Sequence, residues 1–148
     1  MEIVNYPNYL IYDDGRLYSK YVNRFLKPAK NNKGYLSIVL SNDKIKCKTH
    51  TIHKLVALHY LPKVEGKNII DHIDRNKLNN NVSNLRWVND CENQANRGVQ
   101  RNSKSGHKNI RILPNGCYYL EIRRNYKIFR KSFKKLDEAI EYRDNYKP

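Results

Sequence analysis

The sequence predicts an α+β fold built from small antiparallel sheets and a few short helices. Three observations support this class. Hairpin patterns fill residues 1–52, a strand–loop–strand–helix pattern follows within residues 69–93, and three strand-like runs precede one amphipathic helix in residues 107–148. Strands that are followed by turns and similar strands favour antiparallel pairing over parallel βαβ units. We therefore expect a sheet-rich N-terminal region, a mixed central region, and a C-terminal three-stranded antiparallel sheet with one helix.

Two hairpins are expected in residues 1–52. Each consists of two strand-like runs around a turn with Gly, Asn or Asp: Tyr9–Tyr12 with Arg16–Ser19, and Gly34–Leu40 with Lys44–Ile52. Alternation within the second pair predicts a sheet with one buried face. Residues 27–33 are expected to be a basic loop whose lysines can contact phosphate. An equal alternative to a functional role for this region is a sheet that only supports the region that follows.

Residues 53–61 are predicted to form a helix that Pro62 ends. The apolar side chains of this helix fall on more than one face. His53 and His59 are six positions apart, so they do not share a helical face as a zinc-binding pair four positions apart would. Both are expected to be structural, or minor DNA contacts. Residues 63–68 form a turn.

The stretch 69–93 carries the residues with the most chemistry. A short apolar strand ends in Asp71-His72, a polar Asn-rich loop follows, and Leu85–Val88 is a second strand. Asn89 and Glu92 have the spacing of a capping box, so a helix is predicted to begin at Asn89 and to carry Asn93. The loop asparagines Asn79, Asn80 and Asn81 are assigned mostly to turns, because Asn tolerates left-handed backbone.

These side chains suit metal-assisted hydrolysis. Asp71 is a hard oxygen donor of the kind that Mg²⁺ prefers, and the amide oxygen of Asn93 can add a neutral donor. Histidine is the side chain whose unperturbed pKa lies near neutrality, so His72 can take a proton from water. In phosphodiester cleavage a divalent cation would stabilise charge on the phosphate and on the leaving oxygen.

The stretch resembles the HNH nucleases, whose active site is a ββα-metal motif, and in particular the homing endonucleases of phages. The match is carried by Asp71-His72, Asn84 before Leu85–Trp87, and Glu92-Asn93, with offsets of 12 and 9 residues from His72 to Asn84 and from Asn84 to Asn93. The resemblance implies that His72 is the general base and that Asp71 and Asn93 bind one divalent cation, Mg²⁺ or Mn²⁺. It also implies that Asn84 braces the motif and orients the imidazole. Residues 34–61 resemble, more weakly, the segments that precede this motif in the family.

Basic residues surround the expected site. Arg75 stands where many members of the family have a small residue, so the loop departs there from the family pattern. Phosphate clamps are expected at Arg75, Lys77 and Arg86. Gly98 is expected to end the active-site helix, which gives a nuclease core over residues 53–98. Residues 99–106 read as a basic linker, or as a plain tether, and charge at Arg97, Arg101 and Lys104 would be attracted to phosphate.

Residues 107–148 are predicted to form a separate domain. Strands are expected over 109–113, 118–124 and 126–133, with a helix over 136–146. This unit resembles the Apetala-type DNA-binding domain, on residues 105–110, Tyr119 and 133–139. The resemblance implies that the open sheet face enters the major groove. Alternation does not tell which residues of the third strand face outward, so the candidates for DNA contact are Lys108, Arg111, Arg123, Lys127, Arg130 and Lys131.

Charge and composition indicate the partner. The 148 residues carry a net charge of +15 and a pI near 9.8, which favours a polyanion, above all double-stranded DNA. A membrane partner is disfavoured because no long apolar span exists. Cys47, Cys91 and Cys117 form no C-x-x-C pair, so a zinc ribbon is not supported. An odd cysteine count without a signal peptide indicates a reducing interior: the cytoplasm, or the host cell interior for a phage protein.

The sequence thus predicts a metal-dependent DNA endonuclease of the homing type that nicks one strand of a specific duplex site. We expect a monomer that requires no protein partner, with a dimer as the alternative that would cut both strands. A rival hypothesis is a non-catalytic DNA-binding regulator, but its sign would be a damaged Asp-His-Asn-Asn set, and the set is intact. A third hypothesis is an RNA-binding protein that stacks bases on tyrosines, which leaves the metal motif unexplained.

Overall fold

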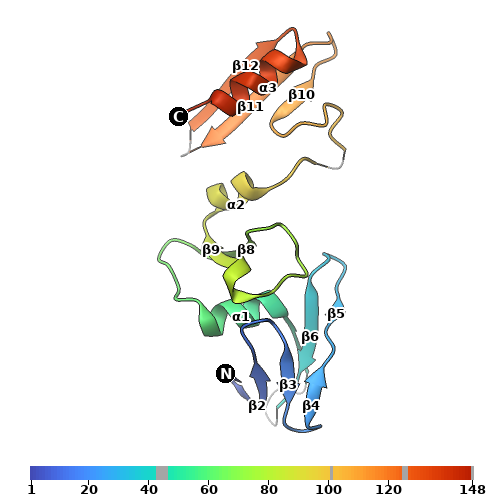
Figure 1. Cartoon of the computed structure of the whole chain (residues 1–148), viewed down its shortest axis with the longest axis vertical. Coiled ribbons are helices and arrows are strands. Elements are labelled where there is room, and N and C mark those ends of the chain that lie inside the picture. The colour runs from blue at the N-terminus through green and yellow to red at the C-terminus, as the bar shows by residue number, and fades with distance from the viewer. Residues whose placement is uncertain (43–46, 101, 125–126, 148) are drawn as a thin grey trace. The chain divides into compact units, whose positions relative to one another are not determined.

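The computed structural model describes residues 1–42, 47–100, 102–124 and 127–147. The chain divides into two compact units, Met1–Asp90 and Cys91–Pro148 (Figure 1). The observed architecture is mixed α and β with several small antiparallel sheets, which confirms the predicted fold class.

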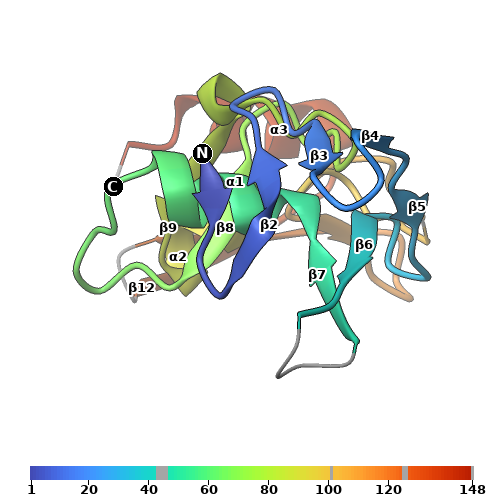
Figure 2. The same ribbon diagram turned by 90° about the horizontal axis from the view of Figure 1, so that it is seen from below.

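The first unit begins with two antiparallel sheets. A four-stranded sheet in the order β1-β2-β3-β4 comprises β1 (Glu2–Ile3), β2 (Tyr6–Ile11), β3 (Leu17–Ser19) and β4 (Arg24–Leu26). A three-stranded sheet comprises β5 (Ala29–Lys30), β6 (Leu36–Leu40) and β7 (Lys48–Thr51). Figure 2 shows β1 and β2 side by side, with the β6–β7 hairpin in the separate sheet.

Both predicted hairpins are confirmed, since β2 pairs with β3 and β6 pairs with β7 in antiparallel register. Residues 43–46 of the second turn lie outside the described residues. Three short strands were not anticipated: β1, β4 and β5. In particular, β5 lies within residues 27–33, where a loop was expected, because its backbone pairs with β6 (Ala29 with Ser37). Strands of two or three residues show too little alternation to be recognised from sequence.

The helix α1 (Ile52–Tyr60) packs into the core of the first unit. Ile52 and Val56 are fully buried, and Leu55 is almost so. They contact apolar side chains of the sheets and of β9, including Ile11, Leu17, Leu40 and Leu85. The prediction of one buried face holds for β6, since Leu40 is buried whereas Val39 is exposed. The hydrophobic core contains residues on both sides of position 52. The hairpin region and α1 therefore share one core.

The remaining elements of this unit form a small ribbon. Strand β8 (Ile69–His72) pairs antiparallel with β9 (Leu85–Val88), with Asp71 opposite Arg86 and His72 opposite Leu85. A 3-10 turn, η1 (Val82–Asn84), leads into β9. The Asn-rich loop connects β8 to η1 and β9.

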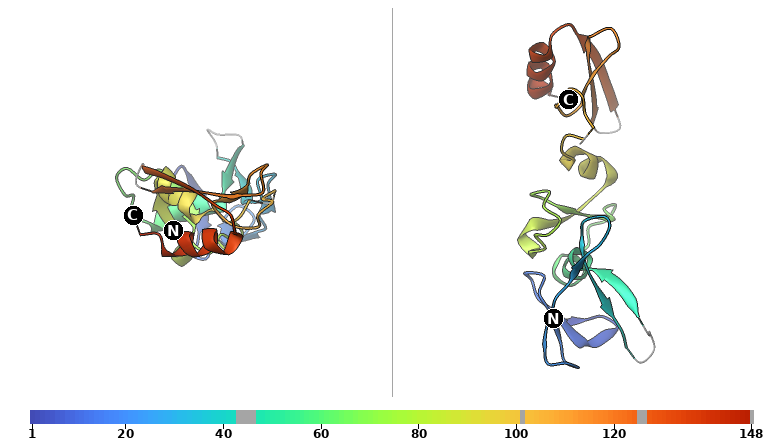
Figure 3. Two further views of the ribbon diagram at one scale, coloured as in Figure 1. Left: turned by 90° about the horizontal axis from the view of Figure 1, so that it is seen from above. Right: turned by 90° about the vertical axis from the view of Figure 1, so that its right-hand side faces the viewer.

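The second unit contains the helix α2 (Asp90–Asn96), whose first residue is the last of the first unit. The helix starts one residue after Asn89, where a capping residue would stand. A three-stranded antiparallel sheet follows, made of β10 (Ile110–Ile112), β11 (Tyr118–Arg124) and β12 (Lys127–Phe133). Helix α3 (Leu136–Asn145) covers one face of this sheet (Figure 3). The three strands and the helix confirm the predicted layout of this region, while residues 125–126, including the expected turn at Asn125, lie outside the described residues.

The two faces of this sheet differ in composition. Leu120 and Ile122 are buried against Ala139 of α3, and Phe129 and Phe133 pack at the edges of the same cluster. Because side chains alternate along a strand, Tyr119, Glu121 and Arg123 of β11 and Arg130 of β12 lie on the face without a helix. We call this the open face. No helix in the described part of either unit is long and apolar enough to cross a membrane.

Candidate active site and basic sheet face

Asp71 lies near the end of β8 and is 9% exposed. The Arg86 guanidinium donates from Nε and Nη2 to Oδ2 of Asp71, at 3.1 and 2.9 Å. The two residues face each other across the ribbon, so strand pairing itself produces this ion pair. Arg86 therefore orients the carboxylate predicted to bind metal, and its own side chain is 45% exposed, which leaves it open to phosphate.

His72, the predicted base, is 5% exposed. Its Nε2 lies 3.1 Å from Oδ1 of Asn80. Asn80 is itself buried, and its amide Nδ2 donates to the carbonyl oxygen of Leu78 at 3.2 Å. The assignment of Asn80 to an ordinary turn was thus incomplete. Its role depends on the fold of the loop, and no sequence pattern distinguishes it from Asn79 or Asn81.

Two rings lie beside His72, and one cation lies over one of these rings. His53 of α1 approaches edge-on with ring centroids 5.3 Å apart, and Tyr35 lies 6.0 Å away. Tyr35 also packs against His53 at 4.7 Å, and the Lys77 ammonium lies 4.5 Å from the Tyr35 centroid. Lys77 additionally donates to the carbonyl oxygen of Lys33 at 2.8 Å. The site therefore draws on β8, α1 and the β5–β6 turn.

His53 is held in its neutral form. Burial of the ring, with smaller effects from the charges of His72 and Lys54, lowers the pKa of His53 from its ordinary 6.5 to about 4. Its Nδ1 is buried without a hydrogen-bond partner. The prediction that His53 is structural holds as far as its burial is concerned, but its contact with His72 was missed because it joins residues distant in sequence.

Asn84 ties the Asn-rich loop together. Its Nδ2 donates to Oδ1 of Asp74 at 2.9 Å and to the carbonyl oxygen of Asn79 at 2.8 Å, while its Oδ1 accepts from the backbone N–H of Asp74 at 3.0 Å. These bonds fit the bracing role expected for Asn84. Its role in orienting the imidazole stays a prediction.

Asp74 organises the same loop rather than standing free in solvent. It accepts from Nδ2 of Asn79 at 2.8 Å and from the backbone N–H of Asn76 at 2.7 Å. These bonds, the one from Asn79 first, lower the pKa of Asp74 below its usual value. The neighbouring Arg75 has φ of +64°, in the left-handed region that favours glycine. Arg75 therefore holds this backbone conformation under strain.

Asn93, the second predicted metal ligand, is half-buried on α2 and belongs to the second unit. Its pairing with Asp71 stays a prediction. Among the described residues no group of three or more His, Cys, Asp or Glu side chains could hold a metal. The expected pair of one carboxylate and one amide oxygen fits a hard cation such as Mg²⁺, which keeps several waters and takes further oxygens from the substrate phosphate.

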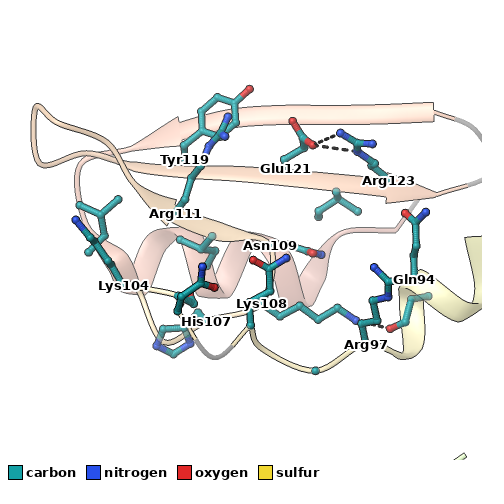
Figure 4. A pocket seen from close by; sticks show the side chains of 18 residues that line it. Gln94, Arg97, Lys104, His107, Lys108, Asn109, Arg111, Tyr119, Glu121 and Arg123 are labelled. Carbon is teal, nitrogen blue, oxygen red and sulfur yellow. Dashed lines mark hydrogen bonds and ion pairs between the residues drawn. The ribbon is translucent and has the colours of Figure 1, made fainter. Parts of the chain in front are cut away.

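The open face of the second unit borders a cavity of about 640 Å³. Figure 4 shows side chains from the sheet and from the segment after α2 around this space. The Lys108 ammonium donates back to the carbonyl oxygen of Ala95. Of the basic residues proposed to contact DNA, the structure places these around the cavity: Arg97, Lys104, Lys108, Arg111 and Arg123.

Glu121 orders the basic residues of the open face. Its two carboxylate oxygens accept from different residues, Oε1 from Arg123 at 2.9 Å and Oε2 from Arg130 at 3.0 Å. These hydrogen bonds lower the pKa of Glu121. Arg111 stacks over the Tyr119 ring with its guanidinium carbon 4.4 Å from the centroid (Figure 4). Several guanidinium groups are thus held in fixed orientations on one exposed surface.

The other two candidates on β12 lie on the opposite side. The ammonium of Lys131 lies 4.2 Å from the centroid of the Tyr142 ring on α3. Lys127 is four positions earlier on the same strand, so its side chain lies on the same face as that of Lys131. This answers the question that the sequence left open: Arg130 faces outward with the open face, and Lys131 does not. Arg101 lies outside the described residues.

Comparison with known proteins agrees with this geometry. The family model described as HNH endonuclease matches residues 50–95. An HNH endonuclease of Acanthamoeba polyphaga mimivirus is 41% identical over 87 residues, which are 59% of this chain and 26% of that protein. The DNA endonuclease I-HmuI of Bacillus phage SP01 is 38% identical over 101 residues, which are 66% of this chain and 58% of that protein.

A solved structure described as DNA binding and cleavage by the HNH homing endonuclease I-HmuI extends the match over almost the whole chain. The TM-score is 0.58 at 30% identity, and the alignment covers 95% of this chain and 80% of that one. The chain therefore belongs to the HNH endonuclease family. It spans only about a quarter of the length of the first mimivirus relative, 26%.

Proposed function

We propose that this protein is a divalent-metal-dependent DNA endonuclease of the homing type that nicks one strand of a specific duplex site. The observation that carries the proposal is the end of β8. There a buried carboxylate, Asp71, and a buried imidazole, His72, occupy consecutive positions on the ribbon that leads into α2. Family membership gives this pair its chemical context.

In this proposal His72 accepts a proton from the attacking water, and Asn80 and the rings of Tyr35 and His53 hold the imidazole in place. Asp71 and Asn93 contribute oxygen ligands, with the Asp71 carboxylate oriented by Arg86. When bound, a divalent cation supplies positive charge to the scissile phosphate and to the leaving oxygen. Because His53 stays neutral, it adds no positive charge against the imidazolium that forms at His72.

Double-stranded DNA is the proposed substrate on both units. Arg75, Lys77 and Arg86 surround the site in the first unit, and the open face presents Arg111, Arg123 and Arg130 in the second. The net charge of +15 supports this, because neutralising phosphates releases counterions and drives binding. The resemblance of the sequence of residues 107–148 to Apetala-type domains supports contact of the open face with the major groove. A monomer carries one such active site, so one cut per binding event is expected.

The experiment is nicking of supercoiled plasmid that carries candidate target sites, in Mg²⁺ and then in Mn²⁺. Wild type should convert supercoiled DNA to open circles. His72→Ala should lower the rate by about 10²–10⁴-fold while still binding DNA. His50→Ala removes an imidazole from the same unit and should cut like wild type.

Binding without cutting by the wild type, on DNA that includes the true target, would favour the regulator. Equal cutting by His72→Ala and wild type would remove His72 as the base. A parallel reaction on RNA separates the RNA-binding hypothesis, because phosphate attraction alone is common to all of these functions.

A further inference from the structure

The loop amide of Asn80 is the polar group that meets the ring nitrogen Nε2 of His72. Both residues are almost fully buried, at 4% and 5% exposure. A buried amide has a definite orientation, because its oxygen only accepts hydrogen bonds and its nitrogen only donates them. The orientation of Asn80 therefore determines which nitrogen of His72 carries the proton.

The second contact of Asn80 fixes that orientation. Its Nδ2 donates to the carbonyl oxygen of Leu78 at 3.2 Å. A flipped amide would place oxygen against oxygen at that position, so Oδ1 is the atom directed at His72. Since Oδ1 can only accept, Nε2 of neutral His72 must be the protonated nitrogen. The lone pair of the ring is then at Nδ1.

Asn80 is in turn held by the N-terminal hairpin. Gly15 closes the β2–β3 turn with φ of +87°, and a Cβ built on it would lie only 2.9 Å from Cβ of Asn80 and 3.2 Å from Cγ2 of Ile52. The same turn accepts a hydrogen bond at the carbonyl oxygen of Asp13 from the backbone N–H of Val82, at 2.7 Å. The hairpin turn thus packs directly on the segment that carries Asn80.

We propose that Asn80 is a positioning residue for the base, and that the Gly15 turn of the N-terminal hairpin holds it there. Asn80 keeps the proton of His72 on Nε2 and so leaves the lone pair of the ring at Nδ1, while Gly15 provides the space that Asn80 needs. This assigns the N-terminal hairpin a part in catalysis through two contacts. The proposal rests on His72 being the base, as proposed above.

The first test reads the ring of His72 directly in the full-length protein, without metal or DNA. In ¹⁵N-labelled wild type at pH 7.5, we expect His72 to be protonated at Nε2, with that N–H protected from exchange with water. Asn80→Ala should speed this exchange at least about tenfold, because the acceptor is lost. Asn80→Asp keeps an acceptor oxygen for Nε2 but loses the donor to the Leu78 carbonyl oxygen, so it should restore the protection only in part.

The second test measures single-turnover nicking at saturating enzyme. Asn80→Ala should slow cleavage by about 10–100-fold, in the range expected for a misplaced base, while DNA affinity stays within about twofold. Gly15→Ala should slow cleavage and disturb the His72 signals. Gly66→Ala is the matched control, because Gly66 also has positive φ, +73°, but a Cβ there meets nothing within 4 Å. It should leave both readouts unchanged.

The outcomes separate cleanly. Unchanged exchange at His72 in Asn80→Ala overturns the proposal, whatever happens to the rate. If Asn80→Ala does not fold, Asn80→Asp and the two glycine variants decide: equal behaviour of Gly15→Ala and Gly66→Ala overturns the role of the hairpin. A wild type that shows the protected Nε2–H but never cuts would refute the proposed function and leave the Asn80–His72 contact standing.

Discussion

Burial of a neutral imidazole at His53 should make the first unit lose stability as the pH falls. The pKa of His53 is about 4 in the folded chain against an ordinary 6.5. Between these pH values His53 is therefore protonated in the unfolded chain but neutral in the folded chain. Stability contributed by the neutral ring is therefore complete above pH 6.5 and declines toward pH 4. The residue is 7% exposed, so solvent screening reduces the effect only in part.

The magnitude follows from the difference of about 2.5 pH units, which at about 1.4 kcal/mol per unit amounts to about 3 kcal/mol below pH 4. At pH 5 the same linkage costs about 2 kcal/mol. His53→Phe keeps a planar ring beside Tyr35 and removes the titrating group. Its free energy of unfolding should therefore fall less than that of wild type between pH 7.5 and pH 5.

The assay is urea unfolding followed by tryptophan fluorescence. Trp87 is the only tryptophan in the sequence and lies on β9, so it reports on the first unit. The comparison at pH 7.5 measures packing alone, because His53 is neutral there. The two proteins differ in their free energy of unfolding. The change in this difference between pH 7.5 and pH 5 measures the effect of protonating His53. If that difference is the same at both pH values, within about 0.5 kcal/mol, His53 is not held neutral and the reasoning is refuted.

Two further predictions concern Arg75 and Glu121. Arg75→Gly should stabilise the first unit by about 0.5–1 kcal/mol, since glycine adopts the positive φ of this position without a Cβ clash, and it should weaken DNA binding. Thermal unfolding measures the first effect and a binding titration the second. A loss of stability would contradict the strain argument. Glu121→Gln should strengthen non-specific DNA binding and reduce discrimination between target and random duplex, because Arg123 and Arg130 lose the carboxylate that orders them. Competition binding at several salt concentrations measures this, and unchanged discrimination would show that Glu121 does not order the reading surface.

Local patterns in the sequence were sufficient for most elements. Asp13-Asp14-Gly15 between strand-like runs predicted the β2–β3 hairpin, and Pro62 predicted the end of α1, because turn residues and proline act over a few positions. Alternation along β11 places Leu120 and Ile122, which are buried, on the face opposite Tyr119 and Glu121. Very short strands escaped prediction, since β5 exists through its pairing with β6.

The sequence by itself determined the neighbouring acid and imidazole, Asp71 and His72, and the order of elements around them, because both depend on local spacing. Only the tertiary structure decided what surrounds them. Arg86 reaches Asp71 through strand register, His53 reaches His72 from α1, and Asn80 meets His72 beneath the Gly15 turn. These contacts join residues that are 8 to 65 positions apart, and they form only when the core brings the segments together.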